Sequence, residues 1–498
     1  MHRVIRKRPL RYRLLSAPTF PMASAPPPND SGIGSIKSPP PERDTSGRRL
    51  WRHGTLVYTT AGLIMLFFWL LLGDFAFFIR ERSAHPIVQL ALKGYGASST
   101  FQSYVLVFIP HAVAFLLQPV IAFKSDRYRS RWGRRIPFLL WATPLTFFSM
   151  IGLAYCPWLA DRTFDLFGNT LPANIGAKEL TLWFFAAFYF LFELACITSI
   201  TLFTSLVNDV VPRAIICRFY GAFRAVSLAP AIIFTSLLLK FAESHFTEIL
   251  VGIGIVFGLG FTFMCLFVKE GEYPPPLDIR AQGNQGTGFF AAARCYWREC
   301  YHHSFYRWVF AAMIFAALSF QPFTNFRIVY AKSLNVELAT YGKIEAISYT
   351  ISFLIAFPVG ILVDRFHPLR LGIATMAIYC LVTIFGAFLI TGPTTFLAAL
   401  MCHLLVSGTF LTSTAALGAL LFPKVTFGQF TAATAVLVNL GSMSLAATQG
   451  PLLDATNNNY SITWMLGGIL ALTALVCLIV TYAKFNKLGG PKGYIAQT

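Results

Sequence analysis

The sequence predicts an all-α polytopic membrane protein whose twelve transmembrane helices form two six-helix bundles. Only 12% of the 498 residues are charged and 56% are hydrophobic, whereas about a quarter of the residues in an ordinary soluble domain are charged. Apolar runs of about 20 residues, the length of a helix that crosses a bilayer, recur along the chain. A polar connection of about 40 residues follows the sixth run. We therefore expect two consecutive bundles within a lipid bilayer.

The positive charges indicate which way the chain faces. Of the 40 Lys and Arg residues, 30 lie in tails and loops on one side of the predicted spans and 8 on the other, while Arg224 and Arg327 lie inside spans. Lys and Arg are retained in short cytoplasmic loops. Both termini are therefore predicted to be cytoplasmic, with the chain in the cell (inner or plasma) membrane. These loops also account for the net charge of +19, so we expect no nucleic acid partner.

The sequence carries no pattern of a catalytic or metal site. The nine cysteines lie mostly within apolar runs and lack the spacing of metal ligands. No P-loop, nucleophile elbow or zinc-binding helix motif occurs. We therefore expect no enzymatic activity, no cofactor and no metal site, and a protein that acts on a small-molecule solute.

The chain divides into five predicted segments. Residues 1–53 are basic and Pro-rich, with too few apolar residues to fold, and predict a disordered cytoplasmic tail. The other segments are the first bundle at 54–268, a cytoplasmic connector at 269–308, the second bundle at 309–484 and a cytoplasmic tail at 485–498. Within the connector, residues 289–308 have the pattern of an amphipathic helix on the membrane surface.

The apolar runs give the predicted spans in order. The first begins near Leu56, and its end is considered below. The other eleven cover residues 101–123, 136–156, 180–206, 221–241, 249–268, 309–331, 341–363, 369–390, 394–421, 429–449 and 462–482.

A basic loop at 122–138, AFKSDRYRSRWGRRIPF, packs six Lys and Arg around one acid, Asp126. A shorter copy, GILVDR at 360–365, follows the eighth span. An aspartate at a helix end, beside guanidinium groups and the N-terminus of the next helix, can hold neighbouring helices together. We therefore predict a gate that opens when this contact is released, the alternative being that the loops only set topology. The predicted gating residues are Asp126, Arg127, Arg131, Gly133, Arg134, Arg135, Asp209, Asp364 and Arg365.

Ionisable side chains inside the spans are candidates for a solute site, because each costs about 3 kcal/mol or more at mid-membrane and needs a partner. These are Asp74, Glu193, Arg224, Arg327 and Glu345. Asn439 and other polar residues of the second bundle could complete a cavity that binds hydroxyl groups. The alternative is that these residues only join helices to one another. His111 and His403 are interpreted as hydrogen-bonded structural residues.

The two loop copies resemble the signature of the major facilitator superfamily, GxxxDR followed by GRR. In the first copy three residues are inserted before GRR, and Gln118-Pro119 precedes the loop. This form, Gly73-Asp74-Phe75, the segment 208–212 and Phe223-Arg224-Ala225 resemble the glycoside-pentoside-hexuronide:cation symporters and the related sucrose transporters. The resemblance implies the major facilitator fold and secondary active transport, with two bundles rocking around a central cavity.

The same resemblance assigns roles to residues of the first bundle. It implies that Asp74 contacts a sugar and that Glu193 and Arg224 help to bind a polyol. It also sets a register that carries Arg80 and Glu81 into the cavity, whereas hydropathy alone ends the first helix near Ile79 and leaves 80–82 outside. A straight helix from 56 to 92 would be about 55 Å long, so the helix must either begin later or break, as it could at Pro86.

The chain departs from this pattern at the cation site, where Ala114 and Gln118 stand in place of carboxylates on the second span. We therefore expect coupling to a proton on Asp74, Glu81 or Glu193, with sodium left open. The expected function is proton-coupled symport of a glycoside or small oligosaccharide by a monomer. The alternatives are transport of a lysophospholipid, peptidoglycan fragment or drug, and pigment handling by a protein that does not transport.

Overall fold

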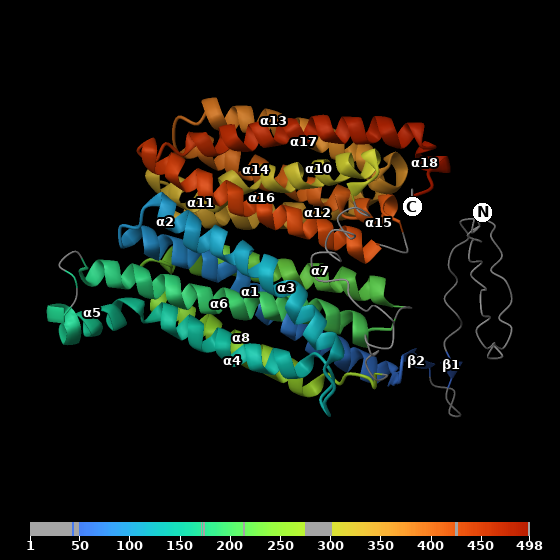
Figure 1. The fold of residues 1–498 in the computed structure, drawn as a ribbon, viewed down its shortest axis with the longest axis horizontal. Coiled ribbons are helices and arrows are strands. Elements are labelled where there is room, and N and C mark those ends of the chain that lie inside the picture. Colours follow the sequence, from blue (N-terminus) through green and yellow to red (C-terminus); the bar gives the residue numbers. More distant parts are fainter. Residues whose placement is uncertain are drawn as a thin grey trace, which may run out of the picture. The chain divides into compact units, whose positions relative to one another are not determined.

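The structure is a computed structural model that describes residues 42–43, 49–170, 172, 175–212, 215–273, 301–423 and 427–496. The side chain of Arg224 lies outside this description. Figure 1 shows the helices in two groups, one coloured blue to green and the other yellow to red. We call them the first and second halves.

The first half contains the helices that precede the connector. They are α1 (Thr60–Gly94), α2 (Ser99–Ser103), α3 (Ile109–Arg127), α4 (Ile136–Ala154), α5 (Cys156–Phe167), α6 (Ala177–Val210), α7 (Ile216–Ile233) and α8 (Phe246–Phe267). A π-helical turn, Tyr104–Phe108, joins α2 to α3.

The second half repeats this plan. Its helices are α10 (Ser304–Ser319), α11 (Gln321–Ser333), α12 (Leu338–Phe366), α13 (Pro368–Phe388), α14 (Pro393–Thr414), α15 (Leu417–Leu421), α16 (Phe427–Ala455), α17 (Ser461–Lys487) and α18 (Gly490–Gly493). The pairs α10–α11 and α14–α15 each form one segment that is long and apolar enough to cross a membrane.

Within the described ranges, eleven helical segments are long and apolar enough to cross a membrane. They coincide with eleven of the twelve predicted spans. The remaining prediction, 221–241, is covered by α7, the π-helical turn Phe234–Leu238 and the 3-10 turn Leu239–Phe241. Its apolar part, Val226–Phe241, is shorter than the other spans.

The first helix begins later than predicted and also ends later, so its 35 residues still extend over about 52 Å. Thr59 is extended, and its hydroxyl accepts a hydrogen bond from the Gly62 amide at 3.1 Å, which caps α1 at Thr60. The predicted break at Pro86 is wrong, because α1 continues through this residue to Gly94. A proline removes one backbone hydrogen bond, and neighbouring helices can hold a membrane helix together around it.

The predicted disorder of residues 1–53 is wrong for its last part. β2 (Arg49–His53) pairs antiparallel with β3 (Leu56–Thr59), and β1 (Glu42–Arg43) pairs with β2. The turn between β2 and β3 has only two residues, and Gly54 adopts a φ of 57° there, which glycine does at little cost. A short hairpin therefore precedes α1, while residues 1–41 and 44–48 lie outside the described residues.

The two predicted polar segments after the bundles are described in part. Residues 274–300, and with them most of the predicted amphipathic helix at 289–308, lie outside the described residues. The seventh span begins earlier than predicted, because α10 starts at Ser304. At the C-terminal end, the Tyr494 hydroxyl donates to the Leu421 carbonyl at 2.7 Å, so the last described residues contact α15.

Both halves have two ends, which we name from the chain direction. The terminus side is the end where α1 begins and α17 ends, and the far side is the opposite end. On the far side, α2 contacts α16 and α12 contacts the π-helical turn after α7. The halves therefore meet along α2–α3 with α16 and along α7 with α12.

Candidate functional site

Charged residues of α1 lie inside the first half rather than outside the membrane. Arg80 is 1% exposed, and its guanidinium lies over the rings of Phe77 and Phe257 at 4.3 and 4.7 Å. Aromatic faces attract a cation, and more strongly when it is removed from water. Glu81, by contrast, is exposed. The structure therefore excludes the hydropathy interpretation, which ends the helix at Ile79.

Glu193 on α6 lies close to this arginine. It interacts with the charge of Arg80 and with the hydroxyl of Tyr189, one turn away on the same helix. The Tyr189 hydroxyl in turn lies 3.4 Å from Nδ1 of His85 on α1. In the first half, the carboxylate of Glu193, the phenol of Tyr189 and the imidazole of His85 therefore lie in a row.

The second half contributes a buried ion pair. Arg327 on α11 and Glu345 on α12 are 2.5 Å apart, with side chains 17% and 4% exposed. The Tyr349 hydroxyl donates to Glu345 Oε1 at 3.0 Å and accepts from Arg327 at 3.5 Å. Because both partners also bond to the tyrosine, the three side chains hold one another in place.

These groups face each other across the boundary between the halves. Arg327 acts electrostatically on His85, and Arg82 on Tyr349. His111 Nδ1 and Asn439 Oδ1 lie 2.9 Å apart, also across the boundary. We call Arg80, Glu81, Arg82, His85, Tyr189, Glu193, Arg327, Glu345 and Tyr349 the central cluster.

The structure brings together most, but not all, of the predicted solute-site residues. Arg80, Glu81, Glu193, Arg327 and Glu345 belong to the central cluster, and Asn439 lies on the same boundary. The sequence interpretation missed four members. A signal was present, because Tyr189, His85 and Tyr349 each stand four residues from a glutamate, which places the two side chains on one helix face.

Asp74 is apart from this arrangement. Its side chain is 0% exposed, and neither carboxylate oxygen has a hydrogen-bond partner among the described residues. It precedes Glu81 by two turns, about 10 Å, on the same face of α1. In this conformation the Asp74 carboxylate is therefore enclosed by the protein without a hydrogen-bond partner among the described residues. Its predicted partner for polyol binding, Arg224, has a side chain outside the description.

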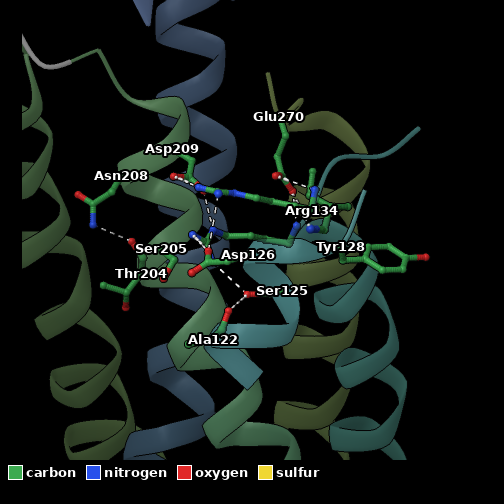
Figure 2. A network of polar contacts seen from close by, with 12 residues as sticks. Ala122, Ser125, Asp126, Tyr128, Arg134, Thr204, Ser205, Asn208, Asp209 and Glu270 are labelled. Atoms are coloured by element: carbon green, nitrogen blue, oxygen red, sulfur yellow. Dashed lines mark hydrogen bonds and ion pairs between the residues drawn. The ribbon is translucent and has the colours of Figure 1, made fainter. Parts of the chain in front are cut away.

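The predicted gating loop forms a network inside the first half (Figure 2). Arg134 contacts Asp209 at 2.8 Å, and Arg135 contacts the same carboxylate at 2.5 Å. Arg135 also reaches Asp126 at 3.0 Å, and Arg134 lies 3.6 Å from it. Burial alone would lower the pKa of Arg134, but the hydrogen bond and charge of Asp209 outweigh it and the pKa is raised. The network joins α3, the α3–α4 loop and the end of α6.

Glu270 completes this network and was not predicted. Its carboxylate accepts hydrogen bonds from the backbone amides of Arg134, Arg135 and Ile136 at 3.0, 2.8 and 2.8 Å. These are the unsatisfied N–H groups at the start of α4, where a helix favours negative charge. Glu270 therefore ties the segment after α8 to the gating loop.

Gly133 allows this close approach. Its φ is 106°, and a Cβ at this position would lie 2.5–2.7 Å from side-chain atoms of Glu270. We predict that Gly133→Ala lowers the melting temperature in detergent, because it costs about 1–3 kcal/mol of backbone strain and displaces Glu270. Gly252→Ala is the control, since a Cβ there meets no atom within 4 Å. Equal melting temperatures for the two variants would contradict the assignment.

The second loop copy does not reproduce the network. Asp364 and Arg365 are both exposed, and the guanidinium of Arg365 lies over the ring of Phe366 at 5.5 Å. Arg127 and Arg131 are exposed as well. The copy lacks a following GRR, because the residues after Arg365 are FHPLR, 366–370. The predicted gating set is thus assembled only at Asp126, Gly133, Arg134, Arg135 and Asp209.

The far side is closed in this structure. The Asp454 carboxylate, at the end of α16, accepts hydrogen bonds from the Ser99 and Thr100 amides of α2, both at 2.8 Å. Lys332 and Glu243 form an ion pair between the halves at 2.5 Å. A carboxylate at the N-terminus of a helix receives both hydrogen bonds and the helix dipole. The loop network on the terminus side coexists with this closure, and its gating role remains a prediction.

Solved structures share this fold, although the sequence matches no family model and no curated protein. A bacterial homologue of the iron transporter ferroportin in an inward-facing state is 16% identical, with a TM-score of 0.61 over 84% of this chain and 99% of that one. A D-xylose-proton symporter is 14% identical, with a TM-score of 0.60 over 83% and 97%. The ferroportin homologue in an outward-facing state scores 0.53 at 16% identity, over 83% and 98%. The chain is therefore an integral, multi-pass membrane protein with the two-bundle major facilitator fold.

Proposed function

We propose that this protein is a secondary active transporter that works by alternating access. The observation that carries the proposal is the central cluster, where charged groups of both halves face each other at the boundary between them. Charges inside a membrane are costly, and they are therefore rare except where they serve a solute or ion path. Because the cluster is divided between the halves, moving one half against the other changes which side can reach it.

We propose further that the solute is a glycoside or small oligosaccharide. The central cluster holds three arginines and three glutamates, so its formal charges cancel, which suits a neutral solute. Carboxylates, guanidinium groups and tyrosine hydroxyls accept and donate the hydrogen bonds that sugar hydroxyl groups need. The boundary also carries Asn439 opposite His111. Solved transporters of this fold act on chemically different solutes, so the fold alone does not select among them.

We propose a proton as the coupling ion. Glu193, a carboxylate of the central cluster that interacts with Tyr189 and with the charge of Arg80, is the proposed carrier of the proton. A proton needs a single titratable group, and Ala114 and Gln118 stand where the resembled symporters place cation-binding carboxylates on the second span.

The test is uptake of a panel of labelled sugars into proteoliposomes under an imposed pH gradient, with sodium varied separately. We expect uptake of at least one glycoside that rises with an inward proton gradient and is unchanged by sodium. The Glu193→Gln variant should lose the response to the gradient. Sodium dependence without a proton effect would overturn the coupling assignment, and uptake of a labelled lysolipid or drug instead of every sugar would overturn the solute class.

A further inference from the structure

His85 is a titratable residue at the boundary between the halves to which the proposed solute site gives no task. It lies on α1 one turn beyond Glu81, and its Nδ1 is 3.4 Å from the Tyr189 hydroxyl. Glu193 interacts with the same hydroxyl. One phenol therefore connects the imidazole to a carboxylate of the first half.

From the second half, a fixed positive charge faces the imidazole. One turn beyond His85, Gln89 of α1 donates a hydrogen bond to the Asn325 carbonyl of α11 at 2.6 Å, so the two helices are packed together here, and Arg327 of α11 acts electrostatically on His85. Arg327 is held in place by Glu345 at 2.5 Å and by Tyr349. Like charges repel strongly where little water screens them. A neutral imidazole is therefore compatible with the position of Arg327, whereas an imidazolium is not.

The other charged groups around His85 do not reverse this preference. On its own helix Glu81 would attract an imidazolium, but Glu81 is exposed and its charge is screened by water. Arg82 is a further positive charge nearby on α1, and it interacts with Tyr349. On α6 the nearest group is Tyr189, which stands between His85 and Glu193. On α12, Glu345 is already occupied by Arg327.

We propose that His85 is the residue through which a proton controls the two halves. Its protonation separates the halves at the far side, and its neutral form permits the far-side-closed conformation seen here. This inference rests on the proposed transport function and deepens it by naming the coupling residue. As the halves close, the imidazolium releases its proton to water, and the neutral imidazole that remains lies with Nδ1 beside the Tyr189 hydroxyl.

The direction of the pH effect follows from this placement. The far-side-closed conformation disfavours the charged imidazole, so it loses stability as the pH falls through the titration of His85. Each unit by which the pKa of His85 differs between the two conformations changes their ratio by about tenfold. Acid should therefore populate a far-side-open conformation.

The experiment measures the distance between spin labels across the far side. Lys178, in the first turn of α6, and Thr391, before α14, are both exposed and belong to different halves. They are replaced by cysteine in a variant without the nine native cysteines, and the distance distribution is recorded in nanodiscs. Between about pH 8 and about pH 5.5, the range in which histidine titrates, the longer-distance population should grow by at least about threefold.

The variants separate His85 from other pH-sensitive groups. His85→Gln and His85→Asn should keep the short distance at both pH values. His85→Arg, whose guanidinium stays protonated at both pH values, should show the long distance at both. The control is His111→Gln, which removes the other boundary histidine and should respond to pH like the parent. A pH response retained in His85→Gln, or none in the parent, overturns the proposal, and size-exclusion profiles confirm that each variant is folded.

The same variants distinguish this inference from the transport proposal. If the distance responds to pH through His85 but no solute is taken up, the inference stands and the transport function falls. If proton-driven uptake occurs and His85→Gln accumulates solute like the parent, the transport function stands and the inference falls. Loss of gradient-driven accumulation in His85→Gln, together with loss of the pH response of the distance, supports both.

Discussion

Glu345→Gln should abolish solute uptake and strongly destabilise the protein, because it leaves the guanidinium of Arg327 buried without its counter-charge. The two side chains are 17% and 4% exposed at a separation of 2.5 Å. Removing one partner of a buried ion pair costs about 3–5 kcal/mol. We expect a large fall in melting temperature in detergent and loss of uptake in proteoliposomes.

The chain provides a matched control for this prediction. Glu243 forms an ion pair of the same length with Lys332 on the far side, but these side chains are 46% and 41% exposed. Exposed ion pairs contribute about 0–1 kcal/mol, so Glu243→Gln should melt within a few degrees of the parent. Comparable destabilisation of both variants would show that burial does not determine how much the Arg327–Glu345 pair contributes to stability. The double variant Arg327→Glu, Glu345→Arg, in which the two charges are exchanged, should recover part of the stability but not the uptake, since His85 then faces a carboxylate.

Asp209→Asn should disassemble the loop network on the terminus side. Asp209 is 15% exposed and is the carboxylate that both Arg134 and Arg135 contact. Hydrogen bonds to charged groups contribute about 1.5–3 kcal/mol, and two arginines lose such a partner at once. We expect a lower melting temperature, and faster labelling of a cysteine placed at Ser125, which is buried beneath Arg135.

Asp364, in the second loop copy, is the control for this variant. It corresponds in the sequence pattern to Asp126, but it is exposed and lies outside the loop network, so Asp364→Asn should change the melting temperature little. If Asp364→Asn destabilises the protein as much as Asp209→Asn, the loss of stability does not come from the loop network. If neither variant has an effect, the network has no structural role.

The sequence predicted the loop network better than the central cluster. Asp126, Arg134 and Arg135 lie within ten residues of one another, so a local pattern was enough to group them. Glu270 could not be found in this way, because it caps α4 through backbone amides that lie 134–136 positions away in the chain. When a residue from another segment caps a helix, the sequence near that helix contains no spacing pattern that reveals it. The prediction for Asp364 failed in the opposite way. Its motif matches the pattern, but without a following GRR it forms no network.

The central cluster required helix direction and depth, which hydropathy does not supply. Arg80 reads as the polar end of a span by hydropathy alone, yet α1 continues past it through Pro86 and buries it among aromatic rings. His85 and Tyr349 look like ordinary helix residues until Arg327 is placed opposite them. Asp74, a predicted sugar contact, is buried without a hydrogen-bond partner among the described residues.

The sequence by itself determined the class of protein, the number and order of the spans and the internal duplication. These follow from apolar runs long enough to cross a bilayer, because a membrane helix must satisfy its backbone hydrogen bonds within its own segment. The tertiary structure decided which charges meet. Pairing depends on where each helix begins and on which face it turns toward the other half. Both are determined by contacts between residues that lie hundreds of positions apart in the chain. For that reason the gating loop could be recognised from its residues, whereas the group formed by His85, Arg327 and Glu345 could not.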